Sequence, residues 1–472
     1  MDRLAEYLNP EQAAAHLRRR DDPDAAEFVA VRNLEYVFSP ETIYPLAPRV
    51  TPPLEKIVAF AVDMDGTSTT TEPLALHALE YMVRRFTGRM TVDAWHGLDP
   101  VADHPFVIGN SNVRHVEFLL DRYRAALDRA ALCRAFFEAV CWTLACMDDP
   151  PRRRAVIHAA RQCGVGALVE DEEFFALTRS GAIDDGNVAV RVVPFIERHG
   201  NQFECTHAGP LAAAALDIYY MRYHSILRAI EAGRGSTLSR ELLGDSARRL
   251  IEPMPGYDLF VPLVKGWIEP EHDALFAWLA SQAEYAVFDT AFPSKENIEK
   301  GTVAERLARL ARHFCVQPAK LALVTASIRY EADATMQEVL KIVGERVRQW
   351  PLPADAREKI AARVSDPASV FDGFICAADA CEHRLKPHPD LYSLALQQML
   401  IPKEDYRCCV GLEDTEPGII ALRAAGVGCA VALPNHDTHR QDYRAASLIL
   451  RGGLPELIVR HNLLLAALTD RS

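Results

Sequence analysis

Two aspartates at the end of an apolar stretch are the first residues in this sequence that could do chemistry. Residues 57–62 are apolar or small and lead directly into Asp63-Met64-Asp65-Gly66-Thr67. A continuous apolar run of this kind predicts a strand buried on both faces, as in a parallel sheet. In open α/β sheets ligands bind at the carboxyl ends of the strands, where Asp63 would lie. An Asp-rich turn without chemistry would look the same locally.

Two carboxylates separated by one residue suit phosphoryl transfer. The first can attack phosphorus as a nucleophile, which gives an aspartyl-phosphate. The second can move the proton of the leaving or entering oxygen as a general acid/base. A hard cation such as Mg²⁺ would hold the first carboxylate and a phosphate oxygen together.

The part of the chain after residue 295 predicts the sheet that would position these aspartates. Short apolar stretches alternate there with helical patterns, which is typical of a parallel sheet with helices on both faces. The expected strands cover residues 321–324, 370–376, 407–412, 428–433 and 446–450. Parallel strands place their carboxyl ends on one edge, so polar groups that follow them can converge with Asp63 and Asp65.

Three later segments supply such polar groups. Thr325, Ala326 and Ser327 follow the strand at 321–324, and we expect them to bind phosphate oxygens through hydroxyl and backbone N–H groups. Lys386, in a loop before a helix, would neutralise the phosphate and orient the nucleophile. Glu413 and Asp414 follow the strand at 407–412. With Asp63 and the backbone carbonyl of Asp65 they would complete an oxygen-only Mg²⁺ site.

Each of these segments has a simpler explanation. Thr325 could cap the next helix, Lys386 could lie in an exposed loop, and Glu413 with Asp414 could be an ordinary charge pair at a helix start. Their joint occurrence, in this order on alternating strands, favours the chemical interpretation.

The four segments together resemble the haloacid dehalogenase superfamily, in the subgroup with a helical cap inserted after the first motif. They cover residues 63–67, 324–327, 386–390 and 411–419, and the last two are similar to β-phosphoglucomutase-like phosphatases and mutases. The resemblance spans about residues 56–72 and 300–460. It implies a Rossmann-like core, Mg²⁺ and an aspartyl-phosphate intermediate, and it does not specify the substrate.

The expected fold is α/β: a Rossmann-like parallel sheet with helices on both faces, plus a large, mainly helical cap inserted after the first strand. We expect an N-terminal extension at 1–55, the core at 56–70 and 295–472, and the cap at 71–294. Within the cap, residues 187–195 could form a strand. The cap is far longer than is usual in the superfamily, so cap residues that set specificity cannot be transferred.

A basic cluster near the start of the cap has two interpretations. Arg84, Arg85 and Arg89 could form a solvated helix face, which we favour, or a clamp for a second anionic group of the substrate. None of the cap histidines has a spacing typical of metal ligands.

Composition limits the partners and the compartment. The net charge of −13 over 472 residues argues against a nucleic-acid partner. The eleven cysteines show no disulfide-framework spacing, no apolar secretory segment begins the sequence, and no stretch predicts a membrane span. We therefore expect a cytoplasmic protein with no membrane partner. An oligomer could form through the cap or the N-terminal extension.

The leading functional hypothesis is a Mg²⁺-dependent phosphatase that acts on a small phosphorylated metabolite, such as a sugar phosphate. Asp65 argues against dehalogenation, which needs no second aspartate. The alternative is a β-phosphoglucomutase-like sugar phosphomutase that uses the same two aspartates and is primed by a bisphosphorylated sugar. A scaffolding or binding protein that uses the large cap is the least favoured hypothesis.

Overall fold

A computed structural model describes residues 27–33, 39–107, 112–205, 207–290, 302–380 and 384–466. Its centre is a six-stranded sheet in the order β5-β4-β3-β6-β7-β8, and every neighbouring pair runs parallel. The strands are β3 (Ala59–Asp63), β4 (Lys320–Val324), β5 (Gly373–Ile375), β6 (Cys409–Glu413), β7 (Cys429–Ala432) and β8 (Leu448–Ile449). The structure confirms the predicted α/β fold and sheet, with β3 between β4 and β6.

The sheet is buried because its residues alternate between two apolar layers. Phe60 and Val62 of β3 belong to one core, and Ala59 and Ala61 belong to the other. On the first face, the ring of Phe60 meets that of Phe260 with 5.2 Å between centroids. Larger side chains therefore face one layer of helices, and alanines allow the other layer to approach closely.

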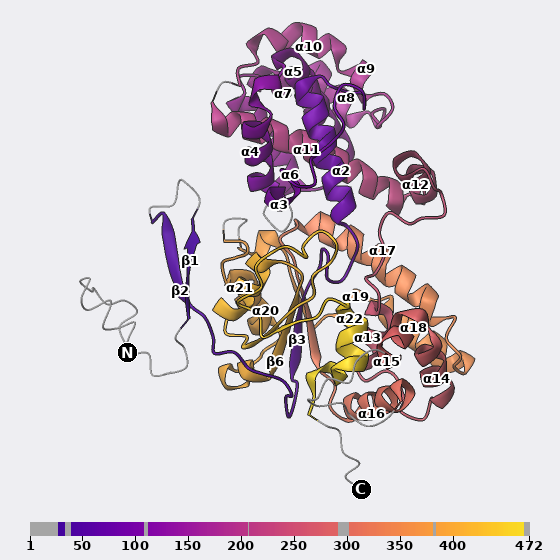
Figure 1. The fold of residues 1–472 in the computed structure, drawn as a ribbon. Coiled ribbons are helices and arrows are strands. Elements are labelled where there is room, and N and C mark those ends of the chain that lie inside the picture. Colours follow the sequence, from indigo (N-terminus) through magenta and orange to yellow (C-terminus); the bar gives the residue numbers. More distant parts are fainter. Residues whose placement is uncertain are drawn as a thin grey trace, which may run out of the picture.

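Helices cover both faces of this sheet (Figure 1). Two of them, α20 (Asp390–Gln398) and α21 (Glu416–Ala424), contribute to the core shared with Ala59 and Ala61. The other core includes residues of α13 (Tyr257–Val264), α16 (Val303–Val316), α17 (Arg329–Val347) and α18 (Ala354–Val364). The remaining helices of this body are α14 (Asp273–Ser281), α15 (Ala283–Thr290), α19 (Pro367–Val370) and α22 (Gly453–Pro455).

A helical bundle stands above the carboxyl edge of the sheet (Figure 1). Its long helices are α2 (Glu72–Thr87), α4 (Asn112–Arg122), α5 (Arg129–Cys146), α6 (Pro150–Gln162) and α11 (Ala208–Glu231). Its shorter helices are α3 (His104–Val107), α7 (Gly166–Glu170), α8 (Glu172–Arg179), α9 (Val188–Arg191), α10 (Val193–His199) and α12 (Gly235–Leu243). The central helix α11 contacts α2, α4, α5 and α6, and it also contacts α17 of the sheet body.

The strand expected at 187–195 is wrong, because α9 and α10 occupy these residues. Val188, Val192 and Phe195 are buried at intervals of four and three residues, which is the spacing of one helix face. Pro194 lies in the first turn of α10, where its fixed φ favours a helix start.

Two paired linkers join the helical bundle to the sheet body. The first follows β3 and the second precedes α13, and they meet in an antiparallel bridge between Thr69 and Pro253. The backbone N–H of Thr70 donates to the carbonyl of Glu252 at 2.9 Å. The domain boundary expected at 294/295 lies outside the described residues, so the division into core and cap stays a prediction.

The N-terminal extension contains a β-hairpin that lies beside the sheet body (Figure 1). Its strands, β1 (Phe28–Arg32) and β2 (Glu41–Pro45), pair antiparallel. Tyr44 hydrogen-bonds the ring of His388 at 2.9 Å, and Arg114 of α4 donates to the carbonyl of Arg32 at 3.2 Å. The hairpin therefore touches both bodies of the molecule.

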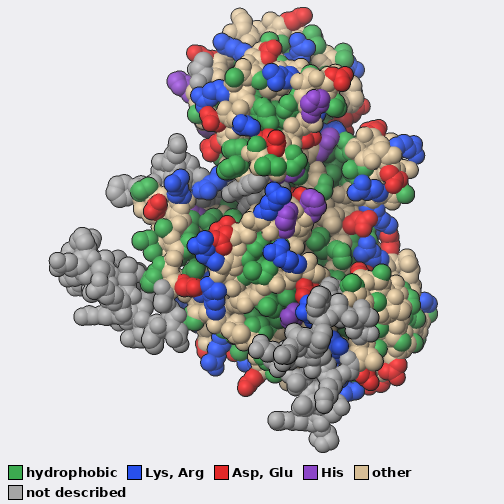
Figure 2. Space-filling view, viewed as in Figure 1, with side chains coloured by type: hydrophobic (Ala, Val, Ile, Leu, Met, Phe, Trp, Pro, Cys, Tyr) green, Lys and Arg blue, Asp and Glu red, His purple; other side chains and the backbone are tan. Residues whose placement is uncertain are grey.

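Acidic and basic side chains are interspersed over the visible face of the molecule (Figure 2). The ten described cysteines are all free thiols. Among the described helices, none combines the length and apolar composition of a membrane span.

Candidate active site

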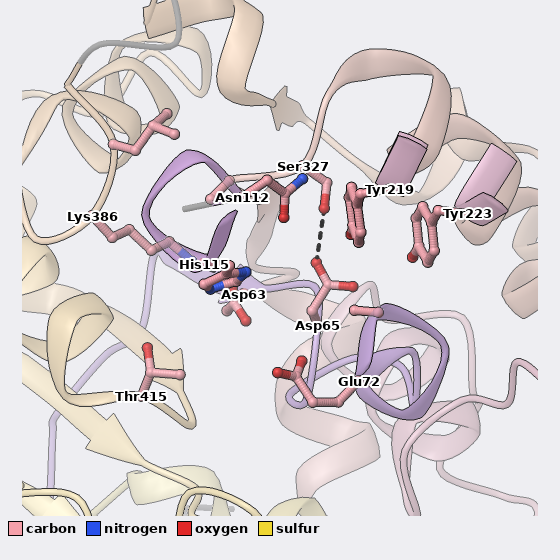
Figure 3. A pocket seen from close by; sticks show the side chains of 13 residues that line it. Asp63, Asp65, Glu72, Asn112, His115, Tyr219, Tyr223, Ser327, Lys386 and Thr415 are labelled. Carbon is pink, nitrogen blue, oxygen red and sulfur yellow. Dashed lines mark hydrogen bonds and ion pairs between the residues drawn. The ribbon is translucent and has the colours of Figure 1, made fainter. Parts of the chain in front are cut away.

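The structure brings the polar groups predicted on separate strands to one edge of the sheet. Figure 3 shows Asp63, Asp65, Ser327 and Lys386 around one cavity between the sheet body and the helical bundle. Asp63 ends β3, and Lys386 lies in the loop before α20. Glu413 and Asp414 stand at the end of β6, beside β3.

Lys386 joins two of these carboxylates. Its ammonium group contacts the carboxylate of Asp63 and lies 2.6 Å from Oε1 of Glu413. Although burial lowers it, the pKa of Lys386 is held above its usual value by Asp63 and Glu413. Burial and the neighbouring Glu413 raise the pKa of Asp63, and Lys386 opposes this shift. The side chain of Lys386 is 7% exposed, so the exposed-loop interpretation is wrong.

Three buried carboxylates could hold a metal ion. Asp63, Glu413 and Asp414 each offer one oxygen, and these oxygens lie within 4.8 Å of one another. Burial and Glu413 also raise the pKa of Asp414. Lys386 supplies one positive charge to these three carboxylates. A hard divalent cation would neutralise the negative charge that remains when they are ionised. The donor set therefore fits such a cation, and the expected contribution of the Asp65 backbone carbonyl stays a prediction.

Asp65 has a different environment from Asp63. One of its oxygens accepts from the hydroxyls of Thr325 and Ser327, both at 3.2 Å, and the other accepts from the hydroxyl of Thr71. Burial raises the pKa of Asp65, and these three hydrogen bonds reduce the shift. Asp65 is thus held by hydroxyl groups, whereas Asp63 contacts an ammonium group.

The segment at 325–327 lies where it was expected, but its hydroxyls bind Asp65 in this structure. Thr325 does not cap the following helix, because α17 begins after Ile328. Ala326 and Ser327 line the cavity.

Sequence reasoning missed the residues that hold the two acidic groups after β6. The carboxylate of Asp414 accepts from Asn435 at 2.8 Å and from Thr67 at 3.2 Å. Glu413 accepts from the Tyr392 hydroxyl at 2.8 Å, and from the backbone N–H and hydroxyl of Thr415 at 3.1 and 2.9 Å. Asn435 follows β7, so its position on the same sheet edge was a signal that could have found it.

The helical bundle supplies the opposite wall of the cavity, which has a volume of about 90 Å³. This wall contains Glu72 of α2, Asn112 and His115 of α4, and Tyr219 and Tyr223 of α11 (Figure 3). Burial, together with the nearby Asp65 and Asp437, raises the pKa of Glu72 to about 8. Sequence reasoning found none of these wall residues because no family motif covers them.

The basic cluster does not reach this wall. Arg84 lies over the ring of Trp95, 4.9 Å from its centroid, and Arg85 forms an ion pair with Glu138 at 2.7 Å. Neither of these two arginines lines the cavity, and their contacts do not support the anion-clamp interpretation.

Comparison with known proteins places this arrangement in a wider group. No protein-family model matches the chain. Protein CbbY of Cereibacter sphaeroides is 27% identical over 170 residues, which cover 31% of this chain and 69% of that protein. The solved structures to which the chain is similar include a HAD hydrolase.

Another is the crystal structure of CbbY from Rhodobacter sphaeroides in complex with phosphate. It is 14% identical, the alignment covers 85% of this chain and 96% of that one, and the TM-score is 0.36. A second crystal structure of that protein holds xylulose-(1,5)bisphosphate, with the same identity, coverage and TM-score. A HAD hydrolase of family IA, variant 3, from Entamoeba histolytica is 12% identical over 86% of this chain and 98% of that one, with a TM-score of 0.34.

Proposed function

We propose that the chain is a Mg²⁺-dependent phosphatase that hydrolyses a small phosphorylated metabolite through an aspartyl-phosphate. The observation that carries this proposal is the contrast between the two aspartates on one cavity. Asp63 contacts the ammonium group of Lys386 and belongs to a carboxylate cluster, whereas Asp65 is held by three hydroxyls. Different environments for two carboxyl groups suit different roles in one reaction.

The proposed reaction has two steps. A carboxylate oxygen of Asp63 attacks phosphorus, the ester P–O bond breaks, and the carboxyl group of Asp65 gives its proton to the leaving oxygen. Asp65 then accepts a proton from a water molecule as that water attacks the aspartyl-phosphate. This step releases inorganic phosphate and restores Asp63.

The surrounding residues would stabilise charge during both steps. Lys386 orients Asp63 and offsets the negative charge of the phosphoryl group. Mg²⁺ bound by Asp63, Glu413 and Asp414 would supply further positive charge for that group. The helical bundle encloses the cavity and would exclude bulk water.

Hydrolysis of p-nitrophenyl phosphate, with and without Mg²⁺, tests this function. We expect Mg²⁺-dependent turnover, and a loss of more than about 1,000-fold in kcat for Asp63→Asn, because an amide is a poor nucleophile. Asp273→Asn, at an exposed position of α14, is the matched control. Turnover that needs no divalent cation, or that survives Asp63→Asn, would contradict the proposal.

The same assay separates the phosphomutase alternative. A mutase would need a bisphosphorylated sugar to prime turnover and would release an isomeric sugar phosphate. A phosphatase needs no primer and releases inorganic phosphate.

A further inference from the structure

We propose that the cavity wall formed by the helical bundle selects an ester with a single phosphoryl group and an uncharged, hydroxyl-bearing remainder, and that it rejects sugar bisphosphates. This inference rests on the proposed phosphatase function and adds the class of substrate. It concerns this chain's own wall residues, for which no motif gave a role.

The first argument is the cation content of the cavity. Among the described residues that line it, Lys386 is the one lysine or arginine. Its ammonium group already contacts Asp63 and Glu413. The undescribed neighbours of the lining residues, at 108–111 and 381–383, contain neither lysine nor arginine in the sequence. A second phosphoryl group would therefore find no strong cation on the wall.

Three arginines on helices of the bundle make contacts elsewhere. Arg85 pairs with Glu138, and Arg222 donates to the ring of His77 at 3.3 Å. Arg114, on the same helix as Asn112, donates to the carbonyl of Arg32 in the hairpin. Sites that recognise phosphate commonly use arginine forks, and these contacts direct the guanidinium groups to protein acceptors.

The second argument is the acidity of the cavity. Asp63, Asp65 and Glu72 all line it, and Asp437 acts electrostatically on Glu72. One phosphoryl group can be balanced at the Lys386 end. A second one at the bundle end would lie beside Glu72 in a desolvated space, where no lining lysine or arginine could balance its charge.

The third argument concerns the tyrosine rings and the hydrogen-bonding groups of the wall. Tyr219 and Tyr223, four residues apart on α11, present rings that stack with 5.8 Å between centroids and an interplanar angle of 10°. Both line the cavity with the amide of Asn112 (Figure 3). The hydroxyl of Tyr219 makes no hydrogen bond among the described residues. Phenol and amide groups suit the hydroxyls of a polyol or sugar, and the flat rings suit its C–H face.

This inference also bears on the choice between phosphatase and mutase. A phosphomutase of this kind must hold a bisphosphorylated sugar during its cycle. A wall that rejects bisphosphates therefore favours hydrolysis.

Calorimetric titration of the Mg²⁺-loaded Asp65→Asn variant tests the inference without relying on turnover. The probes are two matched pairs, fructose 6-phosphate with fructose 1,6-bisphosphate and ribulose 5-phosphate with ribulose 1,5-bisphosphate. We expect at least one monophosphate to bind at least 10-fold more tightly than its bisphosphate. Equal or tighter binding of both bisphosphates, or no binding of either monophosphate, would overturn the inference.

The two proposals fail in different ways. If the wild type hydrolyses p-nitrophenyl phosphate but binds bisphosphates as tightly, only the inference about substrate falls. If monophosphates bind preferentially but nothing is hydrolysed, only the phosphatase function falls.

Two wall variants localise the effect. Asn112→Arg adds a cation and is expected to shift the monophosphate-to-bisphosphate affinity ratio at least 10-fold toward the bisphosphate, whereas the control Asn112→Gln leaves the ratio unchanged. Tyr219→Phe should raise KM for a hydroxylated monophosphate by about 2- to 10-fold, which corresponds to one lost hydrogen bond. Its effect on KM for p-nitrophenyl phosphate, which has no hydroxyl group to bind, should be smaller. Equal effects on both substrates would show that Tyr219 only packs.

Discussion

Gly418 lacks a side chain at a point where the buried carboxylate of Glu413 fills the space. A Cβ atom on Gly418 would lie 1.8 Å from Oε1 of Glu413. That carboxylate cannot move cheaply, because Tyr392 and Thr415 hold it by hydrogen bonds and it is fully buried.

We therefore expect Gly418→Ala to displace Glu413 and weaken cation binding. The Mg²⁺ concentration needed for half-maximal hydrolysis of p-nitrophenyl phosphate should rise by about 10-fold or more, the scale on which ligand-orienting residues act. Gly209→Ala is the control, since a Cβ atom there would meet nothing within 4 Å. An unchanged Mg²⁺ requirement in Gly418→Ala would argue against Glu413 as a metal ligand.

The proposed role of Asp65 as general acid predicts a dependence on the leaving group. Asp65→Asn should slow the hydrolysis of an alkyl phosphate by about 100-fold or more, because an alkoxide must be protonated as it leaves. The rate of the first step with p-nitrophenyl phosphate should fall less, because p-nitrophenolate leaves without a proton. Burst kinetics with each ester would measure this difference, and equal losses in the first step would count against Asp65 as the acid.

The sequence predicted the residues of the site whose role depends on their own chemical type and on a strand end. Asp63, Asp65 and Lys386 are of this kind, and they lie together on the cavity. Tyr392 and Asn435 act through contacts that exist only after folding, since their partners Glu413 and Asp414 are 21 residues away in the chain. No local pattern encodes such a contact.

At the scale of elements, helices α11 and α17 meet through a buried pair of titratable side chains. His224 of α11 lies 3.0 Å from the carboxyl group of Glu331 of α17, and each side chain is 1% exposed. Burial lowers the pKa of His224 to about 3, so its ring is neutral at ordinary pH. Burial raises the pKa of Glu331 to about 8. Near pH 7 the contact therefore joins a neutral ring and mainly a neutral carboxylic acid.

This shift predicts a pH dependence of stability. The folded protein keeps a proton on Glu331 that the unfolded chain releases above about pH 4.5, so the free energy of unfolding should fall as pH rises from about 4.5 to 8. The contribution of this group is at most about 1.4 kcal/mol per pH unit.

Thermal unfolding of Glu331→Gln between pH 5 and 9 would measure this contribution. The Tm of the variant should fall less than that of the wild type as pH rises, because glutamine does not ionise. Glu358→Gln removes a carboxylate that is 63% exposed and should follow the wild type. A Glu331→Gln curve parallel to that of the wild type would contradict a protonated Glu331.

Strands and helices could be predicted where the spacing of apolar residues in the sequence fits one type of secondary structure. The strands β3, β4 and β6 are continuous apolar runs and were found from the sequence. The stretch at 187–195 is rich in valine, which favours strands, but packing of its spaced apolar residues against the bundle makes it helical.

At the scale of the whole molecule, the hairpin of the N-terminal extension contacts the loop that holds Lys386. The hydroxyl of Tyr44 contacts His388 and accepts from Arg384 at 2.6 Å, and these two residues flank Lys386 in sequence. Sequence analysis assigned no chemistry to this extension, because the contacts join residues 340 and 344 positions apart.

Tyr44→Phe should therefore lower kcat/KM for p-nitrophenyl phosphate by about 2- to 10-fold while leaving the fold intact, since it removes the hydrogen bonds and keeps the ring. Circular dichroism and Tm serve as controls for folding. Tyr406→Phe, a tyrosine of the sheet body outside the cavity lining, should behave as the wild type. Unchanged kcat/KM in Tyr44→Phe would mean that the hairpin does not order the Lys386 loop.

Among the described residues, the bundle is attached at its linkers, along α17 and at the hairpin, and the linker and hairpin attachments differ in strength. On the linker side, backbone hydrogen bonds pair two neighbouring segments, whereas on the hairpin side the hydrogen bond described between Arg114 and Arg32 is exposed. If the two bodies separate, we expect the exposed hydrogen bond at the hairpin to break before the backbone hydrogen bonds between the linkers. The hairpin, which holds no motif residue, would then set how readily the bundle and the sheet body separate at this side.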